Sequence, residues 1–235
     1  MTMTGSRRLF VAVGALVAVA AASLGFAQQN ILNDPSRPEA ERARDAGSKP
    51  LELYAFFGVE SGATVADMMP AAGYNTIILA AMVGDSGKVY SGPTGGRRDR
   101  ITPRLEANPL SNVELVAGYD AIPAGSLDVI ITIRNLHHVV GSNGEAATFA
   151  QWMTALKPGG VLGVVDARTT MEGYDGSTHR INEQTMIDAI TAAGFELVES
   201  SDLLANADDD LSQNAETGNR YDIDRMALKF RKPGM

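Results

Sequence analysis

The chain holds three histidines, His137, His138 and His179, the side chains best suited to exchange a proton near neutral pH. Two follow an apolar run at 129–133 and the third precedes the segment 182–193, so we expect all three at one edge of the fold. His138 and His179 are therefore candidate general bases or acceptor-positioning groups, and packing or helix capping is the alternative. Asp166, which ends another apolar run, joins them as a candidate catalytic residue.

No metal site is predicted from these residues. Ligands must converge on an ion at about 2 Å, and adjacent residues such as His137 and His138 seldom both point inward. The acidic run Asp208-Asp209-Asp210 is interpreted as exposed surface, because it lacks the spaced ligands and the glycine of a calcium loop.

A second set of polar residues follows the predicted strands. Asp67 ends the run 64–68, and a turn of small residues leads through Ala71 and Gly73 into an amphipathic segment that begins near Tyr74. Small residues let a ligand approach the backbone, and the first turn of a helix offers unpaired N–H groups to a carboxylate or phosphate. We therefore expect a ligand-binding loop here.

Apolar runs and turn signals alternate from residue 50 onward. Runs such as 129–133 are typical of strands buried on both faces of a parallel sheet. The alternation predicts an α/β fold, a Rossmann-like, doubly wound sheet whose ligand lies beyond the carboxyl ends of the strands. Strands are predicted at 64–68, 88–90, 113–116, 129–133, 161–165, 195–199 and 225–230, helices at 51–57, 75–83, 146–156 and 182–193, and a turn at Lys157–Gly160.

Four strand ends match one family when taken in order. The motifs are Asp67…Gly73, Tyr119-Asp120-Ala121-Ile122-Pro123, Asn135-Leu136-His137-His138 and Leu156-Lys157-Pro158-Gly159-Gly160-Val161-Leu162. The stretch from about residue 50 to residue 232 resembles class I S-adenosylmethionine (SAM)-dependent methyltransferases, and this implies seven strands with the last one inserted antiparallel. Within the family it is similar to predicted exported methyltransferases, which have a comparable Arg44-Asp45…Lys49-Pro50 lead-in and a tail like 227–233.

The resemblance implies a role for each matched position. Asp67 would hold the amino end of SAM, and Gly73 with the backbone of Ala71 and Tyr74 would pass beside its methionyl part. Asp120, followed by Ala121, would accept a hydrogen bond from the adenine amino group. Asn135 would lie beneath the sulfonium. Carboxylates and carbonyls suit an amine and a sulfonium, and direct displacement mainly requires alignment of the acceptor with the methyl group.

Two departures from the family pattern weaken the predicted cofactor site. Ala71 and Ala72 stand where the family has or often has glycine, and a left-handed alanine costs about 1–2 kcal/mol, which we expect to weaken SAM binding about tenfold per 1.4 kcal/mol. No acid follows the second strand until Asp99, so the ribose lacks its usual partner. Ser91 could replace it only in part, because a charge-assisted hydrogen bond contributes about 1.5–3 kcal/mol.

The first 27 residues have the layout of a secretory signal peptide. Arg7 and Arg8 precede an apolar run from Leu9 to Leu24, and Gly25-Phe26-Ala27 is a cleavage site. A retained N-terminal anchor is the alternative. We expect a cleaved leader, a linker at 28–49, a methyltransferase-like domain at 50–233, and a protein that is exported to the periplasm or secreted.

Composition narrows the possible partners. The net charge of −8 becomes −10 once the two arginines of the leader are removed, which argues against nucleic acid and anionic membranes as partners. The absence of cysteine excludes disulfides and thiolate sites.

Three functions are compared on these grounds. The first is a SAM-dependent methyltransferase with a small-molecule acceptor. The second is an inactive methyltransferase-like binding protein with a weakened SAM site. A nicotinamide dehydrogenase is disfavoured, because no Gly-x-Gly-x-x-Gly follows the first strand. In the loop after Asp166, Tyr174 and Arg180 either shape the acceptor site or belong to a solvated loop with a surface ion pair.

Overall fold

The computed structural model describes residues 30–96, 99–217 and 221–234. The predicted leader, 1–27, lies outside these residues. No helix in the described part of the chain is both long and apolar enough to cross a membrane.

The chain divides by its internal contacts into a unit up to Arg42, which contains most of α2 (Glu39–Ala43), and a second unit from Ala43 onward. The second unit begins before Pro50, the predicted start of the domain. Its first helix, α3 (Asp45–Ser48), is tied to the domain because Tyr74 Oη donates to Asp45 Oδ1 at 2.6 Å and Arg225 Nη2 donates to the Gly47 carbonyl at 2.7 Å.

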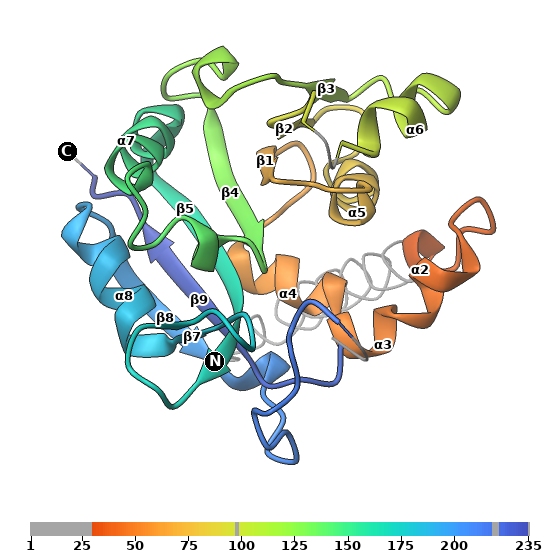
Figure 1. The fold of residues 1–235 in the computed structure, drawn as a ribbon. Coiled ribbons are helices and arrows are strands. Elements are labelled where there is room, and N and C mark those ends of the chain that lie inside the picture. The colour runs from red at the N-terminus through yellow and green to blue at the C-terminus, as the bar shows by residue number, and fades with distance from the viewer. Residues whose placement is uncertain (1–29, 97–98, 218–220, 235) are drawn as a thin grey trace, which may run out of the picture. The chain divides into compact units, whose positions relative to one another are not determined.

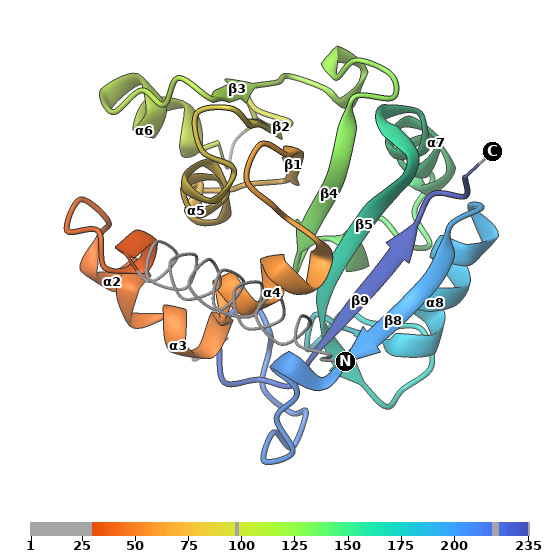
Figure 2. The same ribbon diagram turned by 180° about the vertical axis from the view of Figure 1, so that it is seen from behind.

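A central sheet runs through the second unit in the order β3-β2-β1-β4-β5-β9-β8 (Figures 1 and 2). The strands from β3 to β5 are parallel, and β9 lies antiparallel between β5 and β8. The predicted α/β, doubly wound, mostly parallel sheet with an antiparallel last strand is confirmed. The strands are β1 (Thr64–Met68), β2 (Lys88–Gly92), β3 (Val113–Leu115), β4 (Leu127–Ile133), β5 (Leu156–Thr169), β8 (Glu196–Ser201) and β9 (Arg225–Arg231).

Two short strands were not predicted. β6 (Tyr174–Asp175) and β7 (Arg180–Asn182) form an antiparallel hairpin, and β7 pairs with the far end of β5. The hairpin extends the sheet beyond the point where the seven-stranded pattern ends.

Helices cover both faces of the sheet (Figures 1 and 2). One apolar core, with Trp152 and Phe149 at its centre, lies between the sheet and the helices α7 and α8. On the other face Phe57 packs so closely on β5 that a Cβ added at Gly163 would lie 2.5 Å from its ring. The helices are α4 (Pro50–Phe57), α5 (Tyr74–Val83), α6 (Ile101–Ala107), α7 (Glu145–Ala155) and α8 (Glu183–Ala192), with the 3-10 turns η1 (Tyr119–Ala121), η2 (Leu136–His138) and η3 (Asp202–Leu204).

The predicted turn at Lys157–Gly160 is wrong, because these residues belong to β5. They form an irregularity within the strand, since Leu127 faces Leu156 while Val129 already faces Val161. Gly159 has φ +77°, a conformation that glycine adopts at little cost. The Lys-Pro-Gly-Gly motif therefore marks a bulge next to β4 rather than the start of a new strand.

Candidate functional site

The loops after β1 and β4 lie side by side, at the place where the strand order reverses. Open α/β sheets bind ligands at such a switch point. Asn135 joins the two loops, because its Nδ2 donates to the Ile133 carbonyl at 2.9 Å and lies 3.4 Å from the Met69 carbonyl. The structure thus places Asn135 at the switch point.

Left-handed backbone is concentrated in these two loops. Met69 has φ +61°, Ala71 has φ +52° and Arg134 has φ +59°. Such values are uncommon for residues other than glycine and cost about 1–3 kcal/mol each. The left-handed conformation anticipated for Ala71 is therefore present, whereas Ala72 does not share it.

Asp67 is buried at the end of β1 and belongs to a chain of hydroxyl groups. The Thr76 hydroxyl donates to Asp67 Oδ2 at 2.6 Å and lies 2.8 Å from the Ser91 hydroxyl. Burial is the main cause that raises the pKa of Asp67 to about 6. Its other oxygen, Oδ1, is buried and accepts no hydrogen bond of normal geometry from the described residues, although the Asn75 side chain and the Thr76 N–H also lower the pKa of this carboxyl group. Oδ1 is therefore the oxygen left for an amine.

Ser91 does not occupy the position expected of it. Its side chain is fully buried and its hydroxyl is taken up by Thr76, so it is not placed to meet a ribose. Asp99 does not replace it, because this carboxylate accepts hydrogen bonds from Gly95 and Thr102 beside the start of α6. The missing acid after the second strand is thus a property of the fold as well as of the sequence.

The turn between β1 and α5 is fixed from one side by α6. The Ala71 carbonyl accepts a hydrogen bond from the Arg100 N–H at 3.2 Å, and the Ala72 carbonyl accepts one from Arg104 Nη1 at 2.9 Å. A Cβ at Gly73 would lie 2.9 Å from the side chain of Ile101. Gly73 also has φ +80°, so its left-handed backbone and its packing against α6 both favour glycine here, independently of a ligand.

Tyr74 begins α5 and points away from the switch point. It is buried, its hydroxyl bonds Asp45, and the Arg44 guanidinium lies 3.7 Å from its ring centroid. Only the backbone of Tyr74 is thus left for the predicted cofactor role. Burial, together with Asp45, raises its pKa well above the usual range.

Asp120 and Ala121 are exposed in η1, which follows β3. A Cβ at Gly118 would lie 2.5 Å from Asp120 Oδ1, so the carboxylate folds back over a glycine that leaves room for it. Asp120 is accessible, as an adenine-binding residue must be.

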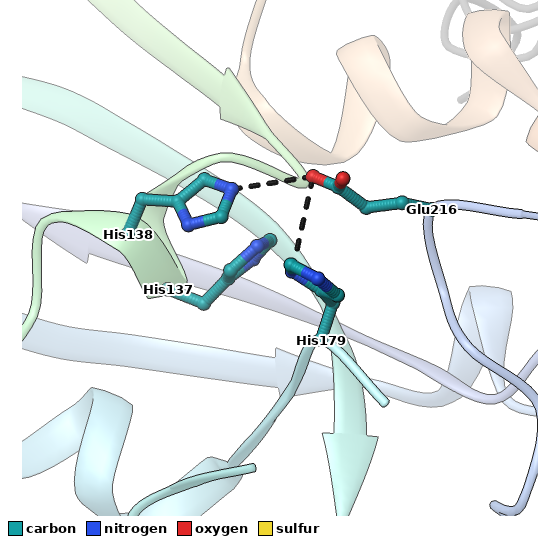
Figure 3. Close-up of side chains that lie close together, drawn as sticks. All are labelled: His137, His138, His179 and Glu216. Carbon is teal, nitrogen blue, oxygen red and sulfur yellow. Dashed lines mark hydrogen bonds and ion pairs between the residues drawn. The ribbon is translucent and has the colours of Figure 1, made fainter. Parts of the chain in front are cut away.

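The three histidines come together beyond the ends of β4 and β5, where Glu216 joins them (Figure 3). His137 and His138 lie in η2, His179 lies in the β6–β7 turn, and Glu216 lies in the loop before β9. The expectation that the histidines share one edge is confirmed.

Buried Asp166 holds His137 by two contacts. Its Oδ2 accepts a hydrogen bond from the His137 N–H at 3.0 Å, and its Oδ1 lies 2.8 Å from His137 Nδ1. The His138 and His179 rings face Glu216, whose Oε1 lies 3.2 Å from His138 Nε2 and 4.0 Å from His179 Nδ1. His179 Nδ1 also lies 2.9 Å from the Tyr174 hydroxyl. Burial and then the carboxylates of Glu216, Asp166 and Asp175 raise the pKa of Tyr174.

A buried ion pair anchors the loop that carries Glu216. Arg180 is fully buried, and its Nη1 lies 2.9 Å from Asp209 Oδ2. The Ala215 N–H donates to the Thr178 carbonyl at 2.7 Å, which ties the loop to the hairpin. The interpretations of Arg180 as part of a solvated loop and of Asp209 as exposed surface are both wrong, because each neutralises the other in the interior.

Sequence reasoning missed one member of the histidine cluster, Glu216, and gave His137 no catalytic role of its own. His137 is buried and His138 is exposed, yet η2 brings both rings into the cluster with Glu216 (Figure 3). A separate open hollow, lined by Asp85, Lys88 and Glu114 among others, lies at the amino ends of β2 and β3, the edge where α/β sheets do not bind their ligands.

No protein-family model matches the chain, and no curated protein matches it by sequence. Solved structures do match its fold. A SAM-dependent methyltransferase from Aquifex aeolicus is 17% identical with a TM-score of 0.58, and the match covers 77% of this chain and 88% of that one.

Two further structures show what the fold accommodates. The 1,6-didemethyltoxoflavin-N1-methyltransferase of Burkholderia thailandensis, solved with 1,6-didemethyltoxoflavin and S-adenosylhomocysteine bound, is 14% identical with a TM-score of 0.56, and the match covers 99% of this chain and 93% of that one. The [4+2]-cyclase SpnF is 15% identical with a TM-score of 0.60, and the match covers 81% and 82% of the two chains. The chain therefore has the class I methyltransferase fold, which serves more than one chemistry.

Proposed function

We propose that this protein is a SAM-dependent methyltransferase that acts on a small-molecule acceptor. The observation that carries the proposal is the presence of buried Asp67 at the end of β1 and of Asn135 just after the neighbouring strand β4, at the switch point of a methyltransferase-like sheet. The solved structures with this fold include methyltransferases, one of which has a small-molecule substrate and S-adenosylhomocysteine bound.

The residues present fit most of the cofactor. The unpartnered Oδ1 of Asp67 suits the ammonium group of SAM, and exposed Asp120 suits the adenine amino group. When bound, SAM would supply an electrophilic methyl group on a sulfonium, which Asn135 would adjoin. The ribose is the part without an anchor, since Ser91 is occupied by Thr76.

The acceptor would lie over the histidine cluster, because η2 begins at the residue after Asn135. His138 and His179 would orient the acceptor and take its proton as the new bond to carbon forms, since imidazole performs such proton transfers near neutral pH. Asp166 would act through His137 by fixing the ring orientation. The cluster therefore supplies both candidate bases named from the sequence.

Calorimetry on the full chain with SAM and with S-adenosylhomocysteine tests this function. We expect micromolar binding of both ligands. Asp120→Ala should weaken it about tenfold or more, because a hydrogen bond to a charged group contributes about 1.5–3 kcal/mol. Asp85→Ala, an exposed acid at the opposite edge of the sheet, is the matched control and should bind as the native chain does.

A second candidate function is an inactive binding protein that has kept the fold. The observation that favours it is the engagement of Ser91 and Asp99 within the protein, which leaves no carboxylate for the ribose. Absence of heat with both ligands would support this candidate against the first.

We further propose that the protein is exported, to the periplasm or outside the cell, by a leader cleaved after Ala27. The support is the basic, then apolar, then small-residue pattern of residues 1–27. An intact mass of the protein recovered from the exporting host checks it, because retention of Met1 to Ala27 would contradict cleavage.

A further inference from the structure

One nitrogen of His137 is buried without a partner. The side chain is 3% exposed, and its Nε2 has no hydrogen-bond partner among the described residues. A buried polar atom left in this way costs about 1–3 kcal/mol. A bound ligand or ion that pairs with His137 Nε2 would remove this cost.

The other nitrogen shows what kind of occupant fits. His137 Nδ1 lies 2.8 Å from Asp166 Oδ1, and a carboxylate at this place makes Nδ1 the protonated nitrogen and leaves the lone pair on Nε2. Metal-binding histidines are typically held in this way by a carboxylate behind the ring. Asp166 is itself fixed by N–H groups of His137 and Ala167, so the orientation of the ring is set by the fold.

Three more ligand groups meet His137. His138, His179 and Glu216 each offer a ligand atom, and the four atoms lie within 4.8 Å of one another. Figure 3 shows the rings and the carboxylate turned toward a common centre. We propose that His137, His138, His179 and Glu216 bind one divalent transition-metal ion of the zinc class.

The donor atoms select the class of metal. Three imidazole nitrogens and one carboxylate oxygen suit Zn²⁺ and its neighbours in the first transition row, whereas Ca²⁺ and Mg²⁺ prefer oxygen ligands throughout. The charge of the surroundings also favours a cation, since Glu216 belongs to the set and Asp166 lies directly behind it.

Only a small contraction would complete the site. Metal–ligand bonds of about 2.0–2.2 Å in a tetrahedron place the ligand atoms about 3.3 Å apart. His138 Nε2 and Glu216 Oε1 already lie 3.2 Å apart, whereas His179 Nδ1 is 4.0 Å from Glu216 Oε1. His138 is exposed and Glu216 lies in a loop, so the remaining movement falls on side chains outside the core. The Tyr174 hydroxyl, now against His179 Nδ1, would give way to the ion.

The backbone supports a site that is built in advance. His179 has φ +53°, a strained conformation held by the β6–β7 hairpin. The loop that carries Glu216 is anchored to the same hairpin through Arg180, Asp209 and Ala215. Both sides of the site are therefore fixed by contacts that do not involve an ion.

Zinc titration of the full chain tests the proposal. The protein is prepared without a polyhistidine tag, treated with a chelator and titrated with ZnCl₂ by calorimetry, and Co²⁺ absorption spectra report the coordination. We expect one ion per chain, and a visible spectrum typical of a four-coordinate nitrogen and oxygen site.

His179→Ala and Glu216→Gln each remove one ligand outside the core and should weaken zinc binding at least tenfold. Glu172→Gln, an exposed glutamate in the nearby loop, and Asp210→Asn, an exposed acid of the 208–210 run, are the matched controls and should bind as the native chain does. Circular dichroism verifies that each variant is folded.

No zinc binding by the native chain, or binding that is equal in the ligand variants and the controls, would overturn the proposal. A bound ion would occupy imidazole nitrogens that the proposed function uses as bases, so His138 and His179 would take a proton only in the chain without the ion. The binding of zinc and the binding of SAM are nevertheless measured independently. Silence with SAM leaves the zinc result standing, and silence with zinc leaves the SAM result standing, so the two proposals fail separately.

Discussion

Replacing Ala71 with glycine isolates the strain in the turn after β1. Ala71 has φ +52°, and the turn is held in place by hydrogen bonds from Arg100 and Arg104 to the carbonyls of Ala71 and Ala72. A left-handed alanine costs about 1–2 kcal/mol. Glycine removes this cost but loosens the unfolded chain, which lowers stability by about 0.4–1 kcal/mol.

Ala72→Gly is the matched control. Ala72 has no positive φ, so glycine at this position only gives the unfolded chain more freedom and relieves no strain. The difference in unfolding free energy between the two variants should equal the strain, about 1–2 kcal/mol. For a domain of this size that corresponds to about 2–8 °C in melting temperature. Urea denaturation and thermal scans of both variants measure it, and an Ala71→Gly variant no more stable than Ala72→Gly would refute the reasoning.

The same variant tests where the strain acts. The expectation that Ala71 weakens SAM binding requires the strain to arise on binding, whereas Arg100 and Arg104 fix the turn as part of the fold. The cost therefore falls on folding. Calorimetry should give Ala71→Gly an affinity for SAM within about threefold of the native value, which is a difference in binding free energy of less than 1 kcal/mol. A tenfold gain in affinity would instead support the interpretation that strain at Ala71 weakens SAM binding.

Three further predictions follow from buried polar groups. Burial raises the pKa of Asp67 from 3.8 to about 6. Between these two pH values the folded chain therefore holds a proton that the unfolded chain releases. The contribution of Asp67 to the free energy of unfolding thus falls as pH rises from about 4 to about 6. Asp67→Asn should remove that part of the slope in urea denaturation at a series of pH values, and an unaltered slope would contradict the assignment. Thr76→Val should destabilise the fold by about 1–3 kcal/mol. It should also raise the pKa of Asp67 further, because the Thr76 hydroxyl lowers that pKa. Thr76→Ser keeps the hydroxyl and should therefore keep the native stability and the native pKa of Asp67 in the same assay. Arg180→Leu should lower the free energy of unfolding by about 3–5 kcal/mol, because it leaves Asp209 buried without its partner. Adding Asp209→Asn should recover part of this stability in a double-mutant cycle. Purely additive losses of stability would argue against a buried ion pair.

The sheet was predictable because its central strands carry a local signal. β4 is buried on both faces and is therefore a continuous apolar run, and the five predicted residues at 129–133 lie within it. The bulge at Lys157–Gly160 was not predictable, because its glycines also favour a free turn. The backbone hydrogen bonds that hold these glycines come from Lys232, and only the flanking residues Leu156 and Val161 pair with β4. β6 and β7 depend on the end of β5 for their pairing, which no short segment of sequence records.

The candidate site was predictable only where the strand ends determine it. Asp67 lies near the end of β1, and Asn135 and His138 come just after β4, so topology brings them to one edge. Glu216 comes from a long polar loop with no periodic signal, and its position depends on the contact between Arg180 and Asp209. Ser91 also lies near the end of a strand, β2, but the direction of its hydroxyl is decided by Thr76 on α5, a partner that sequence order does not reveal.

Strained backbone occurs both in the predicted cofactor site at the switch point and in the histidine cluster. Four of the six described non-glycine residues with positive φ lie at the switch point (Met69, Ala71 and Arg134) or in the histidine cluster (His179), and the other two are Lys49 and Leu211. Each such residue costs about 1–3 kcal/mol and persists only where its surroundings determine it. A connection that merely had to join two strands could use any relaxed turn, so the surroundings hold these loops to one particular geometry. The two places so held are the one that would bind the cofactor and the one where three imidazoles and a carboxylate converge, which is the arrangement expected if both still bind ligands.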